Sequence, residues 1–178
     1  NKYLNSLLFA DYSIGYFIEE ARKEPWFYDT VFIFVADHTF NRNGNIKEKY
    51  HIPFLIYAPK YVKAQKSDTL GSQLDILPTL FDLLRLQEPY SAAGKTLFAE
   101  DGERRALFAD GYTIGLIKND GAIRHTREKA LEEEKYEGTF DKTKAEEELL
   151  SLDKTVFTLI KEDRWYPSEE ENDAKNGD

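Results

Sequence analysis

The sequence contains no cysteine among its 178 residues, so it has neither a disulfide framework nor a thiolate for catalysis. Basic residues are in the minority, because 24 Lys and Arg stand against 33 Asp and Glu, for a formal net charge of −9. Binding to a phosphate backbone needs clustered Lys and Arg, and we therefore expect no nucleic-acid partner. Long apolar runs are also absent: the longest, VFIFVA at residues 31–36, is far shorter than the about 20 residues that span a bilayer.

The length allows one domain with a sizeable core, or one domain and a small appendage. The chain starts at Asn1 rather than at Met and runs at once into a helical pattern. We therefore expect it to be a portion of a longer protein, with any signal peptide or membrane anchor lying upstream.

Helical and strand patterns alternate in the first half. Residues 3–24 place apolar side chains at helical spacing, which predicts an amphipathic helix packed on another surface. Residues 31–37 and 53–58 are continuous apolar runs, typical of neighbouring strands that are covered on both faces. Residues 74–85 predict a second helix that covers the same sheet. This order indicates α/β architecture.

Two carboxylates in these helices are interpreted as structural. Asp11 falls on the apolar stripe of the first helix, and we expect it to be buried and hydrogen-bonded to a neighbouring loop. Ser72 or Asp75 is available as the N-cap of the second helix, and Pro78 is tolerable in its first turn.

The second half is more polar. Residues 105–125 are short segments with turn residues between them, and Asn119-Asp120-Gly121 is a hairpin signal, so we predict a small antiparallel sheet. A long charged helix should follow from about Thr143 to Arg164. Residues 168–178 form an acidic tail that should be disordered.

The first strand ends on Asp37-His38, and ligands of α/β sheets gather beyond such strand ends. A carboxylate oxygen and an imidazole nitrogen together suit Zn²⁺ or Mn²⁺. Adjacent side chains alternate in direction along a strand, so both can reach one ion only if the backbone turns here. Taken alone, the dipeptide favours a structural histidine.

A second histidine changes this interpretation. His51 stands immediately before the second strand, so it and His38 bracket one polar loop. We therefore expect Asp37, His38 and His51 to converge on one solvent-accessible point. The remaining histidine, His125, lies in the hairpin region without an acid of its own and is interpreted as a solvated surface residue.

Four segments, in this order, carry a family resemblance: YLNSLLFADYSIGYFIEE, VFIFVADHT, HIPFLIYAP and SQLDILPTLFDLL. They resemble the second half of the catalytic domain of the alkaline-phosphatase/sulfatase superfamily, and most of all its lipoteichoic acid synthase-like and phosphoglycerol transferase branch. Thr39 departs from the commoner Asp-His-Gly. The resemblance implies an α/β fold with a mixed sheet flanked by helices. It also implies a catalytic-domain portion at 1–98, a small antiparallel sheet with a long helix at 99–167, and the tail at 168–178.

The resemblance also implies roles for individual residues. Asp37 and His38 match two ligands of a catalytic divalent metal, which could be Mn, Zn, Mg or Ca. His51 matches a histidine that contacts a second metal or the substrate phosphate in phosphotransferase relatives, where sulfatases often have Lys nearby. Asp75 matches an aspartate with a structural role. The nucleophile of the family lies upstream of the matching region, so we expect no catalytic nucleophile in this chain and no turnover by it alone.

The expected function is therefore that of a metal-dependent phosphoglycerol transferase or sulfatase-like hydrolase. Its substrates would be phosphate or sulfate esters, lipid-linked esters among them, and His51 favours phosphoryl transfer. The N-terminal half of the same protein would complete the site, and the resemblance implies a location at the extracytoplasmic face of the cell membrane. The alternative is a non-catalytic binding or scaffolding module that keeps the fold with a decayed site.

Overall fold

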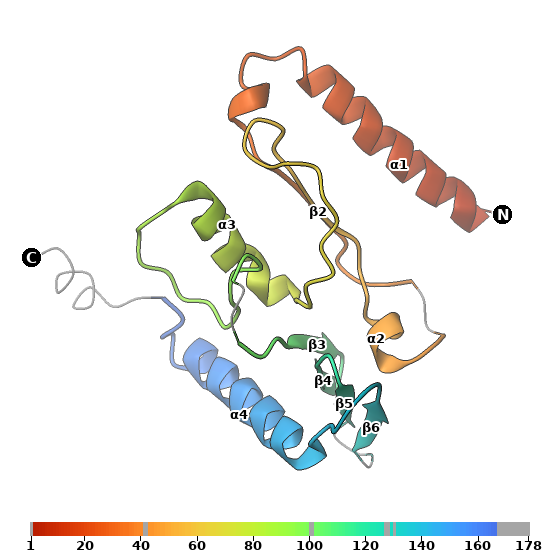
Figure 1. Cartoon of the computed structure of the whole chain (residues 1–178), viewed down its shortest axis with the longest axis vertical. Helices are drawn as coiled ribbons and strands as arrows, with labels where there is room; N and C mark the ends of the chain where they lie inside the picture. The colour runs from red at the N-terminus through yellow and green to blue at the C-terminus, as the bar shows by residue number, and fades with distance from the viewer. Residues whose placement is uncertain (1, 41–42, 100–101, 127–128, 130, 167–178) are drawn as a thin grey trace, which may run out of the picture. The chain divides into compact units, whose positions relative to one another are not determined.

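The computed structural model describes residues 2–40, 43–99, 102–126, 129 and 131–166. The chain divides into two compact units: residues 1–39 with 52–67 form the first, and residues 40–51 with 68–178 form the second. Each unit has its own antiparallel sheet and at least one long helix (Figure 1).

The expected α/β class is confirmed. The resemblance implied a mixed sheet. In the described residues the first sheet consists of β1 and β2, which pair antiparallel, and no parallel strand joins them. The domain boundary expected at residue 98 stays a prediction. The expected disordered tail at 168–178 lies outside the described residues.

The first unit is built from one helix and two strands. α1 (Lys2–Ala21) leads into the short 3-10 helix η1 (Phe27–Asp29). β1 (Phe32–Val35) then pairs antiparallel with β2 (Phe54–Tyr57). The prediction that these two segments are neighbouring strands in one sheet is confirmed.

Aromatic side chains form the core of the first unit. Phe27 and Phe32 are 1% and 8% exposed, and their ring centroids lie 5.5 Å apart. Ala21, at the end of α1, packs on them. The expectation that both faces of the strands are covered is wrong for the described unit, since Val35 and Leu55 are 42% and 54% exposed. The reason is that the described unit contains one long helix, α1, which does not cover both faces of the two-stranded sheet.

The helix predicted at 3–24 is confirmed as α1, but its apolar stripe is not packed. Ile18 and Ala21, near its C-terminal end, reach the core of the unit, and the Phe17 ring lies edge-to-face with that of Phe32. Asp11, expected to be buried, is exposed. The apolar residues of the stripe are 44–68% exposed: Leu4, Leu7, Leu8 and Ile14.

The second unit carries the larger sheet, and the predicted antiparallel sheet and long helix are both confirmed. Its strands follow each other in the order β3-β4-β5-β6, every pair antiparallel. The elements in chain order are α2 (Ile46–Lys49), η2 (Gln73–Asp75), α3 (Ile76–Leu84), β3 (Ala106–Asp110), β4 (Thr113–Ile117), β5 (Gly121–Thr126), β6 (Glu132–Lys135) and α4 (Lys142–Lys161).

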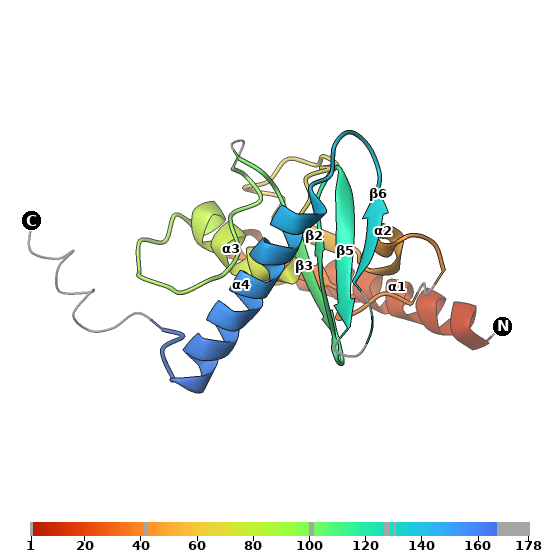
Figure 2. The same ribbon diagram turned by 90° about the horizontal axis from the view of Figure 1, so that it is seen from below.

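Both faces of the larger sheet are covered. Leu116 and Ile123, which pair across β4 and β5, belong to the core that α4 completes with Leu149. Their neighbours Ile117 and Ala122, which form the next pair, belong to a second core. That second core contains Ile46 of α2, and α4 crosses the sheet in Figure 2. Since side chains alternate between the faces of a strand, α4 and α2 cover opposite faces.

The predicted hairpin lies where the sequence placed it. The backbone N–H of Lys118 donates to the carbonyl of Gly121 at 2.8 Å, so Asn119 and Asp120 form the turn between β4 and β5. A Cβ atom at Gly121 would lie 2.4 Å from Cγ of Phe140. Glycine is therefore required here by the close approach of a core ring, rather than by the turn.

Asp75 has the structural role that was expected of it. It is 6% exposed, and its two carboxylate oxygens accept hydrogen bonds from the backbone N–H groups of Ser72 and Lys95, both at 2.7 Å. The carboxylate thus holds the start of α3 to a segment twenty residues further along the chain.

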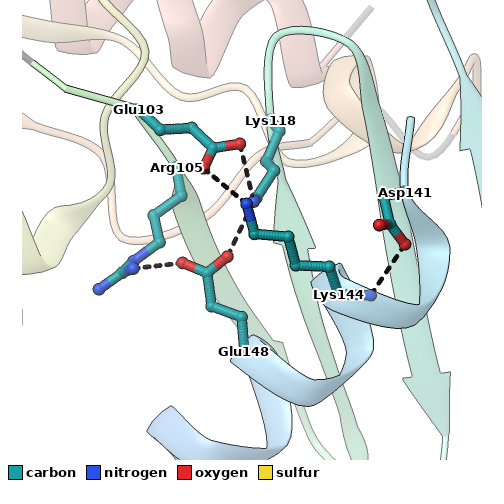
Figure 3. Close-up of polar contacts among 6 residues, drawn as sticks. All are labelled: Glu103, Arg105, Lys118, Asp141, Lys144 and Glu148. Carbon is teal, nitrogen blue, oxygen red and sulfur yellow. Dashed lines mark hydrogen bonds and ion pairs between the residues drawn. The ribbon is translucent and has the colours of Figure 1, made fainter. Parts of the chain in front are cut away.

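A partly buried ion-pair network joins the residue that follows β4, Lys118, to α4 (Figure 3). Lys118 is 5% exposed, and its Nζ lies 2.8 Å from Glu148 Oε2 and 3.0 Å from Glu103 Oε1. Arg105 pairs with the other oxygen of Glu148. Burial by itself would raise the pKa of Glu148, but the hydrogen bonds from Lys118 and Arg105 outweigh it and lower the pKa. Burial would likewise lower the pKa of Lys118, but its two carboxylate partners raise it.

We expect this network to make folding stability depend on pH. The pKa of Glu148 is lowered on folding, so its contribution is fully present above the ordinary Glu value of about 4.3 and is lost as pH falls through the folded value. The pKa of Lys118 is raised, so its contribution is fully present below about 10.4 and is lost as pH rises further. Denaturant unfolding at pH 7 and pH 3 should show the stability difference between the unmodified chain and Glu148→Gln shrinking at the lower pH. A difference that does not change would contradict this.

Candidate functional site

Asp37 and His38 lie just beyond β1, separated from it by Ala36, at a bend of the backbone. Nε2 of His38 lies 3.6 Å from Oδ2 of Asp37, and both side chains are largely exposed, at 78% and 88%. The backbone N–H of His38 donates to Oδ1 of Asp37 at 2.9 Å. The turn that the two adjacent side chains need in order to meet is therefore present.

A backbone carbonyl orients the imidazole. Nδ1 of His38 lies 3.1 Å from the carbonyl oxygen of Thr39. Because a carbonyl only accepts, Nδ1 carries the proton in this bond, and the lone pair of a neutral ring is then on Nε2, which faces Asp37. Histidine ligands of metals are typically held in this way through their second nitrogen.

The donor set fits part of a divalent-metal site. Ligand atoms that each lie about 2.0–2.2 Å from one Zn²⁺ ion in a tetrahedral arrangement are roughly 3.4 Å apart, close to the spacing of Nε2 and Oδ2 in this pair. Two ligands do not complete a site, however. Within the ranges that the structure describes, no group of three or more His, Cys, Asp or Glu side chains could hold a metal ion.

His51 lies in the other unit. It follows α2 and Tyr50 at the end of the segment 40–51, whereas Asp37 and His38 belong to the first unit. The convergence of the three residues therefore stays a prediction. The His51 side chain is exposed, and its ring has no hydrogen bond or ion pair with another described residue.

His125 differs from the solvated residue that was expected. It lies within β5, opposite Ile114 of β4, and is half-buried. The strand position explains this burial, because β5 is an inner strand of the four-stranded sheet.

The sequence interpretation missed the residues that hold the segment before His51. Glu134 in β6 and Tyr136 just after it hydrogen-bond to the backbone of α2. The segment Glu132–Lys135 reads EEEK, which has no strand periodicity of apolar residues, so no signal in the sequence marked these side chains.

Comparisons with known proteins agree with the fold. The Sulfatase family model matches residues 1–86. An arylsulfatase of Clostridium perfringens is 28% identical over 120 residues, which are 61% of this chain and 25% of that protein. A sulfatase of Formosa agariphila is 26% identical over 131 residues, which are 68% of this chain and 26% of that protein.

One solved structure shares the architecture. A protein of the alkaline phosphatase superfamily from Vibrio parahaemolyticus matches with a TM-score of 0.68, over 89% of this chain and 41% of its own, at 22% identity. The chain thus has a fold of the alkaline phosphatase superfamily, and its N-terminal half matches the Sulfatase family. It spans about a quarter of the length of the curated relatives that it matches. The lipoteichoic acid synthase-like branch stays a prediction.

None of the helices in the described part of the chain is long and apolar enough to cross a bilayer. The expected extracytoplasmic location of the whole protein stays a prediction.

Proposed function

We propose that this chain is part of a metal-dependent hydrolase or transferase of sulfate or phosphate esters, and that Asp37 and His38 are two ligands of its divalent metal. One observation carries the proposal: a carboxylate and an oriented imidazole face each other, 3.6 Å apart, at the end of a strand inside the region that matches the Sulfatase family.

The two residues have distinct parts in this proposal. The metal, when bound, supplies charge neutralisation for the sulfuryl or phosphoryl oxygens and activates a nucleophile. Asp37 contributes negative charge to the site, and the Nδ1–H bond from His38 to the Thr39 carbonyl fixes the direction of the imidazole and leaves Nε2 to the metal. The nucleophile and the remaining ligands would come from the rest of the protein.

The choice between sulfate and phosphate rests on different observations. Both curated relatives carry sulfatase names, which favours sulfate-ester hydrolysis. His51 favours phosphate esters, because an imidazole here resembles the phosphotransferase branch. The exposed His51 ring is accessible to an ester oxygen of either kind.

Mn²⁺ titration of the chain tests the metal site directly. The three histidines give three ring signals by NMR, and we expect Mn²⁺ to broaden the His38 signal first while the His125 signal stays sharp. The affinity should be weak, because the described residues bring only two ligands together, and Asp37→Ala should weaken it further by about tenfold or more. Equal broadening at His38 and His125, or no effect of Asp37→Ala, would overturn the metal assignment. The alternative function, a non-catalytic binding or scaffolding module, would then be favoured.

A further inference from the structure

The short helix α2 is attached to the C-terminal sheet through its first two amide groups. The backbone N–H of Ile46 donates to Oε2 of Glu134 at 2.6 Å, and that of Lys47 donates to the hydroxyl oxygen of Tyr136 at 3.0 Å. The Tyr136 hydroxyl in turn donates to Oε2 of Glu134 at 3.3 Å. Two side chains that lie almost ninety residues further along the chain thus bind this turn of helix.

The attachment is reinforced by packing on both sides of the two hydrogen bonds. Ile46 is 1% exposed and lies in the core under the sheet. At the other end of α2 the ring of Tyr50 stacks on that of Phe108 in β3, with centroids 3.6 Å apart and an angle of 17°. His51 follows Tyr50 directly, so its backbone position is set by residues that the sheet holds.

Local interactions shape the same segment. Asn45 and Glu48 form a reciprocal capping box, with hydrogen bonds of 2.8 and 3.0 Å between side chain and backbone. Gly44 precedes the cap with φ of +94°, a conformation that favours glycine. The backbone at Gly44 and Asn45 therefore enters α2 in a defined conformation.

We propose that Glu134 and Tyr136 are positioning residues, which place His51 for its contact with the ester group by anchoring α2 to the C-terminal sheet. This inference rests on the proposed function for the role of His51, but not for the anchoring itself. It gives the C-terminal sheet, which lies beyond the part that matches the Sulfatase family, a role in the reaction.

The chemistry of the two groups suits an anchor. A carboxylate that accepts from a backbone N–H makes a charge-assisted hydrogen bond, stronger than a bond between neutral groups. Burial raises the pKa of Tyr136, as does the neighbouring Glu134, so its hydroxyl stays protonated at neutral pH and can accept from Lys47 while it donates to Glu134. Each polar group of the anchor is therefore satisfied.

The test uses two readouts that separate the anchor from the reaction. In the chain, Glu134→Ala should shift the His51 ring signal and speed amide exchange at residues 46–49 by at least about tenfold, while the His125 signal keeps its position. Glu134→Gln keeps an acceptor oxygen and should restore most of the protection. Tyr136→Phe removes only a hydroxyl group and should give an intermediate effect without loss of the fold. Glu137→Gln and Tyr112→Phe, both at exposed sites, are matched controls.

In the whole protein, Glu134→Ala should lower kcat by about tenfold with a smaller change in KM, because a misplaced group weakens transition-state contacts most. Unchanged exchange at residues 46–49 in both Glu134→Ala and Tyr136→Phe would overturn the anchor. A changed exchange with unaltered kcat would overturn the positioning role. The proposed function is tested separately, by the effect of Asp37→Ala on turnover, so its failure is distinguishable from failure of the anchor.

Discussion

Asp37→Ala in the whole protein is expected to lower kcat/KM on sulfate and phosphate esters by at least about 10²-fold, because it removes a metal ligand and with it the charge that neutralises the ester oxygens. The fold should hardly change. The Asp37 side chain is 88% exposed and packs in no core, so its removal leaves no cavity.

Asp11→Ala is the control variant that separates the loss of a metal ligand from the loss of a negative charge. Asp11 is an exposed carboxylate in the same unit, on α1, and its removal changes the net charge by the same amount. We expect Asp11→Ala to keep normal turnover and Asp37→Ala to lose it, with equal unfolding transitions by circular dichroism. His38→Ala should reproduce the loss. Near-normal turnover of Asp37→Ala would mean that the Asp-His pair is structural, and the enzyme assignment would then have to be abandoned.

Periodicity predicted the elements whose apolar residues face a neighbour. The runs at 31–37 and 53–58 became β1 and β2, and the helical patterns at 74–85 and 143–164 became α3 and α4. The hairpin at Asn119 and Asp120 was predictable because it depends on local turn chemistry. Each of these features is determined by residues that lie close together in the sequence, which is why the sequence alone was sufficient to predict them.

Burial was less predictable, because it depends on what each element meets. The stripe of α1 has the same periodicity as a packed helix, yet only its C-terminal end reaches the core of its unit. β4 and β5 appeared short and polar, yet Leu116, Ala122 and Ile123 are fully buried. Their burial comes from α4 on one face and α2 on the other, and both contacts are distant in sequence.

The residues of the candidate site also differ in whether the sequence could predict them. Asp37 and His38 were found from the sequence because the apolar run stops on them, and their side chains do meet. Glu134 and Tyr136 were not found, because their role depends on a contact with α2 across almost ninety residues and no local pattern marks it. The convergence with His51 joins two units and stays a prediction.

Glu148→Ala is expected to be the most destabilising single change in the ion-pair network. It removes the carboxylate that lies 2.8 Å from Lys118 and also pairs with Arg105, so the buried ammonium keeps only Glu103. The loss of one of two carboxylate partners of a buried charge costs roughly 2 kcal/mol of unfolding free energy, which corresponds to a fall in Tm of about 4–8 °C for a chain of this size. The neighbouring Glu147 is exposed, and Glu147→Ala should change stability by less than about 0.5 kcal/mol.

A second substitution identifies the unpaired lysine as the cause. Lys118→Met in the Glu148→Ala background removes the ammonium group and leaves an apolar side chain of similar length, so the double variant should be more stable than Glu148→Ala alone. Lys118 directly follows β4 and Glu148 lies in α4, so the network fastens the helix to the sheet that also carries the α2 anchor on its opposite face. Denaturant unfolding followed by far-UV circular dichroism measures both variants. If Glu148→Ala and Glu147→Ala unfold alike, or if the double variant is the less stable one, the network does not hold α4 in place.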